Sequence, residues 1–117
     1  LDASLGTLEA SPLELARAWQ RFASADEVVG GMSRRSRQSV LAALRRPLPG
    51  VPLPREQELA WKTGTSSRRR DAWCAGVTAG SVIVVWLGNL NGRGAPDLVG
   101  ARSAAGLVAA VAALAGA

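Results

Sequence analysis

The 117-residue chain is 48% hydrophobic and carries a formal net charge of +5, which indicates a globular domain with its own core rather than a disordered chain. It contains no histidine, which excludes a Ser-His-Asp or Cys-His mechanism and an imidazole metal site within these residues. The single cysteine, Cys74, can form no disulfide within the chain, and its apolar neighbours indicate a small core residue.

The two ends of the chain show neither a signal peptide nor a membrane anchor. The first residue is Leu1 rather than methionine, and residues 1–8 lack the charged and apolar regions of a signal peptide. The apolar stretch 101–117 contains Arg102 and is shorter than the roughly 20 residues that a membrane-spanning helix needs. We therefore expect an excised piece of a longer protein, with no membrane contact from this segment.

The first predicted helix begins at Pro12. Ser11 can accept a hydrogen bond from a backbone N–H as the N-cap, Pro12 suits the first helical position, and Glu14 completes a capping box. The pair Gly30-Gly31 is expected to end the segment that follows this helix. Apolar residues at helical spacing form its expected inner face: Leu15, Trp19 and Phe22.

A second helix is predicted from about Ser33 or Ser36 to Arg46, and Pro47 ends it. The two arginines in its last turn would interact favourably with the negative end of the helix dipole. The prolines between 47 and 55 then predict an extended linker. The expected inner face of this helix consists of Val40, Leu41 and Leu44.

Three strands follow, at 59–66, 72–77 and 82–87, separated by turn-forming segments at 67–71 and 78–81. Short turns between sequential strands predict an antiparallel meander.

A loop at 88–97 leads to a final helix that begins near Arg102 or Ser103. The predicted fold class is therefore α+β, with one antiparallel sheet covered by helices, in a single domain portion over 1–117.

The first strand contains the only lysine of the sequence, beside thirteen arginines. In an extended strand Lys62 and Gly64 fall on one face, and Thr63 and Thr65 fall on the other. A lone cation, a glycine that lets another backbone approach, and neighbouring hydroxyls suit an extended anionic ligand. A half-buried strand whose lysine side chain reaches water explains the same spacing equally well.

Several motifs occur in order around this strand. They are Lys62-Thr63-Gly64-Thr65-Ser66, Arg70-Asp71-Ala72-Trp73 and Val85-Trp86-Leu87-Gly88, with Ser4-Leu5-Gly6 and the segment 11–16 upstream. The three motifs resemble the K-T-G-T-S, R-D-A-W and V-W-[VL]-G motifs of the penicillin-binding transpeptidases of the bifunctional class A type. The two upstream segments resemble the part of that domain that precedes the K-T-G box. The resemblance covers nearly all of the chain and implies the C-terminal half of that domain.

The resemblance implies a DD-transpeptidase that cross-links peptidoglycan through an acyl-serine, acts on a D-Ala-D-Ala stem peptide and is a target of β-lactams. Lys62 would supply positive potential, and the hydroxyls of Thr63 and Thr65 would bind the substrate carboxylate. The backbone N–H of Thr65 would be one oxyanion-hole donor, and Gly64 would leave the strand edge bare for substrate.

The serine motifs of that family are absent from these residues, since the sequence contains no S-x-x-K and no S-x-N. The resemblance therefore implies a nucleophile in an N-terminal half of the domain before Leu1, and a segment that is inactive alone. Two strands of the five-stranded family sheet would also be missing, which would leave one sheet edge unprotected. No metal or other cofactor is implied.

The implied location is the periplasmic or extracytoplasmic face of the bacterial cytoplasmic membrane, where an N-terminal helix outside this chain would anchor a parent that is also a glycosyltransferase. Two other functions stay open. The net charge and the arginine run 68–70 suggest a basic nucleic-acid-binding module, although no recognised nucleic-acid-binding motif is present and the family resemblance implies no nucleic acid partner. A non-catalytic remnant that completes a domain with another chain is the second.

Two side-chain groups also have alternative interpretations. Arg68, Arg69 and Arg70 form either a solvated turn or a contact with anionic glycan or lipid phosphates. Trp73 and Trp86 are either core residues on paired strands or sugar-stacking surfaces.

Overall fold

The computed structural model describes residues 10–47, 59–65, 71–88 and 104–114. Helices α1 (Pro12–Ser24) and α2 (Arg34–Leu44) precede a sheet and a last helix, α3 (Ala104–Leu114). The sheet has the order β1-β2-β3, formed by the antiparallel strands Ala60–Thr65, Asp71–Val77 and Val82–Gly88. The predicted α+β class and antiparallel meander are confirmed.

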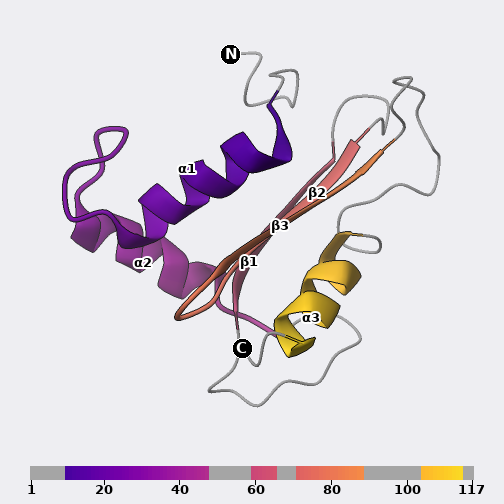
Figure 1. Cartoon of the computed structure of the whole chain (residues 1–117). Coiled ribbons are helices and arrows are strands. Elements are labelled where there is room, and N and C mark those ends of the chain that lie inside the picture. Colours follow the sequence, from indigo (N-terminus) through magenta and orange to yellow (C-terminus); the bar gives the residue numbers. More distant parts are fainter. Residues whose placement is uncertain (1–9, 48–58, 66–70, 89–103, 115–117) are drawn as a thin grey trace.

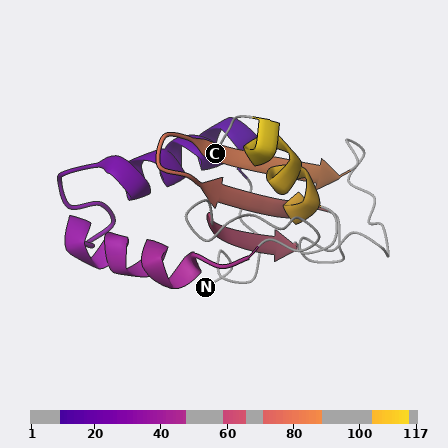
Figure 2. The same cartoon turned by 90° about the horizontal axis from the view of Figure 1, so that it is seen from below.

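The sheet lies between two layers of helices. In Figure 1 it is seen edge-on, with α1 and α2 on one side and α3 on the other. Figure 2 shows the three strands side by side. Helix α1 packs on β3 and β2, whereas α2 contacts β1.

The start of α1 follows the predicted capping box. The backbone N–H of Glu14 donates to Ser11 Oγ at 3.1 Å, and the N–H of Ser11 donates to Glu14 Oε1 at 3.1 Å. The predicted inner face is half-buried, and no residue of α1 is fully buried. Trp19 and Phe22 meet edge to face with ring centroids 5.8 Å apart. Apolar burial alone therefore holds α1 only weakly.

A buried arginine on α2 fastens the end of α1. The side chain of Arg37 is fully buried and donates to backbone carbonyls only, at 2.9 Å to Phe22 O, 2.9 Å to Glu27 O and 2.8 Å to Met32 O, with Ala25 O as a further acceptor. Phe22 and Ala25 lie at the C-terminal end of α1, where backbone carbonyls lack helical partners and the helix dipole is negative. The guanidinium thus ties α2 to the end of α1 and to the loop after it.

The two glycines of that loop form a tight turn. Gly30 and Gly31 have φ values of +57° and +78°, which residues with a Cβ atom rarely adopt. On either side of them, Val29 and Met32 exchange two backbone hydrogen bonds of 3.0 and 2.9 Å. The pair therefore makes a two-residue hairpin turn between the helices.

The end of α2 corrects the predicted boundary. The helix ends at Leu44, and Arg45 is its extended C-cap, so neither Arg45 nor Arg46 lies in its last turn. The reason is tertiary, because Arg45 forms a β-bridge with Ala60 of β1. Of the predicted inner face, Leu41 is buried and Leu44 half-buried, but Val40 is 37% exposed, so its prediction is wrong.

The strand boundaries differ slightly from those predicted. β2 begins at Asp71, which the sequence places in a turn, and β3 continues to Gly88, because these two residues pair with each other. The turn between them at the other end is confirmed: Thr78 Oγ1 accepts from the N–H of Gly80 at 3.2 Å and of Ser81 at 2.9 Å. The sequence predictions for residues 4–6, for 48–55 of the linker, and for 66–70 and 89–103 lie outside the described residues.

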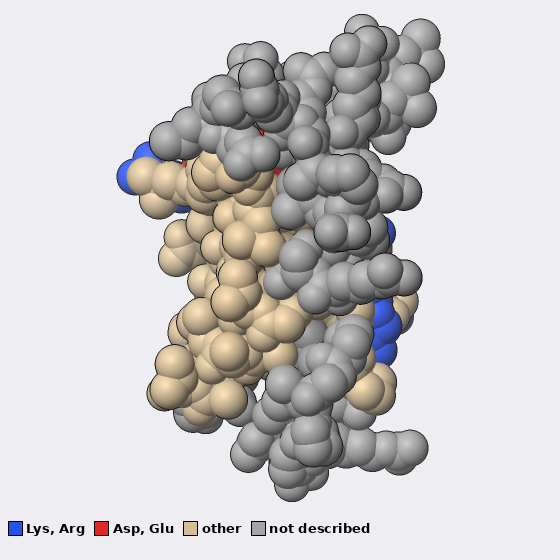
Figure 3. Space-filling view, turned by 90° about the vertical axis from the view of Figure 1, so that its right-hand side faces the viewer, with Lys and Arg blue, Asp and Glu red and all other residues tan. Residues whose placement is uncertain are grey.

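The apolar core lies between the sheet and α3. Alternate residues of the strands point into it, and Ile83, Val85 and Leu87 of β3 pack against it. On its outer side α3 exposes Leu107, Val111 and Leu114, and Figure 3 shows uncharged side chains over most of the described surface there. The buried members of this core are Leu59, Trp61, Cys74, Ala104, Ala105, Val108, Ala109 and Ala112.

The thiol of Cys74 has the buried position that its apolar neighbours predict. It is fully buried in this core, and burial raises its pKa to about 11, partly offset by the positive charge of Arg46. A thiol with such a pKa is almost entirely protonated at neutral pH and is a poor nucleophile.

Replacing Arg37 with methionine should lower the free energy of unfolding by at least about 3 kcal/mol, because four backbone carbonyls lose a charged donor inside the protein. Urea unfolding followed by far-UV circular dichroism measures this. The matched control is Arg35→Met on the exposed side of the same helix, expected to change stability by less than about 0.5 kcal/mol. Equal effects of the two substitutions would contradict the role of Arg37.

Cys74 should make stability depend on pH in the alkaline range. Its pKa rises from an ordinary value of 9.0 to about 11 on folding, so the folded state holds the proton more tightly. The stabilisation is complete below about pH 9 and is lost as the pH rises through about 11. Subtracting the pH profile of Cys74→Ala from that of the wild type isolates this contribution in urea titrations. A difference that stays constant from pH 8 to pH 11 would refute it.

Candidate functional site

The lysine strand is an outer strand of the described sheet, and contacts with residues 45 and 46 anchor its start. The backbone N–H of Arg46 donates to Leu59 O at 3.3 Å, next to the bridge between Arg45 and Ala60. The indole N–H of Trp61 donates to Arg46 O at 3.2 Å, and the Arg46 guanidinium lies 3.8 Å from the centre of the Trp61 ring. The sequence did not single out Arg46 for this role, because its partner lies 15 residues away along the chain.

Side chains along β1 alternate between the two faces as predicted. Trp61 is buried in the core against α3, and Lys62, one residue on, points to the opposite face and is exposed. Thr63 is half-buried and Thr65 exposed, both on the face of Trp61. The structure thus places the ammonium group and the two hydroxyl groups on opposite faces of the strand.

The backbone groups of Thr63 and Thr65 point to the outer edge of β1. Leu59 O points away from β2, toward residue 46, because it accepts the Arg46 N–H. Backbone groups of alternate residues point to the same edge of a strand, so those of Thr63 and Thr65 also point to this outer edge of β1. The ammonium of Lys62 reaches around to this edge and donates to Thr63 O at 3.1 Å. The outer edge of β1 therefore joins the predicted site residues, through main-chain groups and one cation.

Gly64 lies exposed between these residues. A Cβ atom added there would meet no other atom within 4 Å, so the fold does not itself require glycine at this position. Opposite it on β2 stands Trp73, whose ring centroid is 6.4 Å from that of Trp86 on β3.

The two tryptophans belong to a half-buried cluster on the Lys62 face of the sheet. The indole N–H of Trp86 donates to Asp71 Oδ1 at 2.7 Å. This contact gives Asp71, the acidic residue of the R-D-A-W motif, a structural position that holds the ends of β2 and β3 together. The sequence does not predict this hydrogen bond, because the two residues are 15 apart in the chain and meet only when β2 pairs with β3.

In the part of the chain that the structure describes, no three His, Cys, Asp or Glu residues are grouped as a metal site would require. None of the described helices is long and apolar enough to cross a membrane.

The sequence is 45% identical over 69 residues to penicillin-binding protein 1C of Escherichia coli strain K12. The matched part amounts to 59% of this chain but to 9% of that protein, so the chain spans a small portion of its relative. No family model matches the chain, and no solved structure matches it. The identity supports a relationship between this chain and the penicillin-binding proteins.

Proposed function

We propose that the chain is the C-terminal portion of a serine-type DD-transpeptidase domain that cross-links peptidoglycan outside the bacterial cytoplasmic membrane. The observation that carries the proposal is the outer edge of β1, where Lys62 lies beside the edge-facing backbone groups of Thr63 and Thr65. The similarity to penicillin-binding protein 1C supports it independently.

In this proposal the edge binds substrate as an added strand. A stem peptide ending in D-Ala-D-Ala would align its backbone with Thr63 and Thr65, as extended peptides do at open sheet edges. The ammonium of Lys62 would attract the terminal carboxylate, and Thr65, a more exposed residue than Thr63, would donate a hydrogen bond from its hydroxyl to that carboxylate. β-Lactams would occupy the same edge.

The reaction itself needs a serine that these 117 residues do not supply in an S-x-x-K motif. We propose that the N-terminal part of the same domain provides it. The serine oxygen attacks the carbonyl carbon of the penultimate D-Ala, the terminal D-Ala leaves with a proton on its amine, and an ester remains. An amine of a neighbouring stem then takes the acyl group and frees the serine. The backbone N–H of Thr65 would stabilise the oxyanion in both steps.

A fluorescent penicillin tests this assignment directly. The 117-residue chain alone should take no covalent label, whereas a longer protein that contains this segment together with an upstream S-x-x-K serine should be labelled. In that longer protein Lys62→Ala should slow labelling by about 10²- to 10³-fold, the usual effect of removing one electrostatic contact to the reacting centre. The control is Arg35→Ala, which removes a charge from the exposed side of α2. Labelling of the short chain, or unchanged labelling of the Lys62 variant, would overturn the proposal.

Gly64 separates a binding role from a folding role. Gly64→Ala should leave the free energy of unfolding within about 1 kcal/mol of the wild type, because the added methyl group enters open space. It should nevertheless slow labelling of the longer protein, because the methyl group projects beside Lys62 where substrate approaches. Gly80→Ala in the β2–β3 turn also enters open space and serves as the control. If penicillin labels the Gly64→Ala and Gly80→Ala variants at the same rate, Gly64 has no role in binding substrate.

A further inference from the structure

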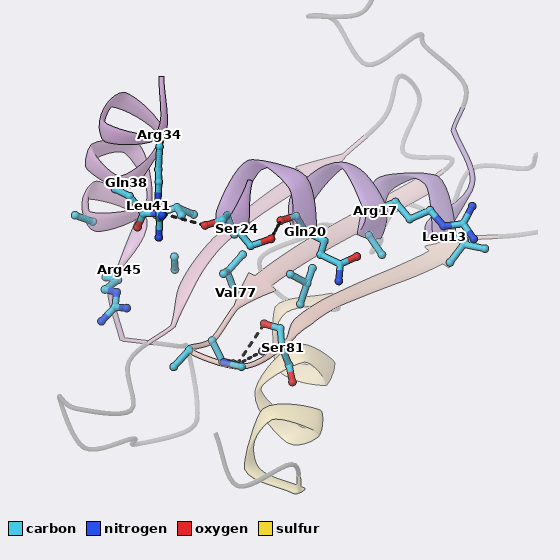
Figure 4. A pocket seen from close by; sticks show the side chains of 18 residues that line it. Leu13, Arg17, Gln20, Ser24, Arg34, Gln38, Leu41, Arg45, Val77 and Ser81 are labelled. Atoms are coloured by element: carbon cyan, nitrogen blue, oxygen red, sulfur yellow. Dashed lines mark hydrogen bonds between the residues drawn. The ribbon is translucent and has the colours of Figure 1, made fainter. Parts of the chain in front are cut away.

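A groove runs between the two N-terminal helices and the end of the sheet at the β2–β3 turn. It has a volume of about 920 Å³. Apolar side chains of the helices and the sheet line it together with polar side chains of α1 and α2, such as Arg17 and Gln20, as Figure 4 shows. We call four of its apolar lining residues, from α2 and the strands, the floor: Leu41, Ala60, Val77 and Val82. We call this feature the hairpin groove.

Arginines surround the hairpin groove. Arg17 of α1, Arg34 of α2 and Arg45 after α2 line it, and none of the described lining residues is an aspartate or glutamate. Among the described residues, Arg34 is paired with Asp26, which is not a lining residue, whereas Arg17 and Arg45 form no ion pair there.

The other described carboxylates are engaged away from the groove. Glu14 is held in the capping box of α1, Glu27 pairs with Arg21 at 3.6 Å, and Asp71 accepts from Trp86 at the far end of the sheet. Across the described residues, the groove therefore has a positively charged lining with an apolar floor.

The charges lie at the two ends of an elongated site. Figure 4 shows Leu13 and Arg17 at one end of the groove, with Arg34 and Arg45 toward the other. From Leu13 to Ser24, α1 extends about 16 Å at 1.5 Å per residue. That length matches about five residues of an extended chain. A single phosphate would reach only one end of it.

We propose that the hairpin groove binds an extended, acidic peptide segment of a partner protein. Carboxylates at the two ends of the segment would pair with Arg17 and Arg45. Apolar side chains between them would cover Leu13, which is 59% exposed, and the valines of the floor. The polar side chain of Gln20, which lines the groove, is placed to bond the peptide backbone.

The shape of the groove favours a peptide over other polyanions. None of the described lining residues is aromatic, so they offer no surface on which unpaired bases would stack. Leu41 and Ala60 of its floor are buried, so a duplex or a flat membrane surface would meet the helices before it met these two residues. The inference is independent of the proposed transpeptidase function, because the groove contains none of the residues 61–65.

Fluorescence anisotropy with the full 117-residue chain tests the proposal. The probe is a short fluorescein-labelled peptide in which glutamate alternates with leucine, and the comparison peptides replace every glutamate with glutamine or every leucine with serine. The acidic, leucine-containing peptide should bind most tightly, and added salt should weaken its binding. Equal binding of the glutamine peptide would overturn the proposal.

Matched charge variants locate the binding. Arg17→Gln combined with Arg45→Gln should weaken binding of the acidic peptide about tenfold, since two partly exposed ion pairs are lost. Arg21→Gln combined with Arg35→Gln removes the same charge from the same two parts of the chain outside the groove, and should leave affinity unchanged within about twofold. All four arginines are exposed, so circular dichroism spectra should remain those of the wild type.

The remaining outcomes contradict the proposal. Equal weakening by both double variants would show that only net charge attracts the peptide. Tighter binding of a single-stranded oligonucleotide, or of vesicles that contain phosphatidylglycerol, with the same dependence on Arg17 and Arg45, would assign the groove to nucleic acid or membrane instead. Absence of peptide binding at every concentration reached would leave the groove without this ligand.

Discussion

The described fold depends on a central strand that can be covered on both faces. Helices pack against β2 on both faces. Its residues that face α3 must therefore be small, and two of them, Ala72 and Cys74, are fully buried. Gly76 shows how tight the packing is: an added Cβ would lie 2.7 Å from Val108 Cγ1 and 3.3 Å from Leu59 Cδ1. Because a protein interior is close-packed, any larger side chain here would push α3 away from the sheet.

The two helical layers are held by different kinds of interaction. Helix α3 contributes alanines and Val108 to a dry core, so dispersion and apolar burial hold it. Helix α1 has no fully buried residue, and the carbonyls at its end depend on Arg37 of α2. In the described residues, the α3 side of the sheet thus contains a fully buried apolar cluster, whereas the large side chains on the other side, Trp73 and Trp86, are half-buried, and the hairpin groove lies on that side.

The two proposed binding regions occupy different parts of the same sheet. Ala60, Val77 and Val82 lie in register at the end where the hairpin groove is, and Thr65, Ala72 and Leu87 lie in register at the other end. The outer edge of β1 offers backbone groups and one ammonium, which suits a strand-like ligand with a carboxylate. The groove offers guanidinium groups over an apolar floor. The chemistry of the two regions is distinct enough for them to act separately.

Local sequence signals predicted the features that depend on neighbours in the chain. The capping box of α1, the alternation of β1 and the turn around Gly80 all rest on contacts within a few residues, and the structure confirms them. The K-T-G-T-S motif is contiguous too, so the sequence alone could predict the site that we propose there.

The features that the sequence did not predict are made by residues distant along the chain. Helix α2 contains Arg34, Arg35 and Arg37, and their sequence gives no sign that only Arg37 is buried. Its acceptors are backbone carbonyls that the loop at Gly30 and Gly31 brings close. Helix α2 stops at Leu44 because residue 45 pairs with β1, a competition that helix propensity does not include.

The sequence by itself therefore determined the order and type of the elements and the strand that contains Lys62. Only the tertiary structure decided that the threonine backbone groups face an outer sheet edge, and that Arg17 and Arg45 share a groove. The physical reason is that edges and grooves arise from how elements pair and pack, and that arrangement depends on free energies summed over contacts far apart in the chain.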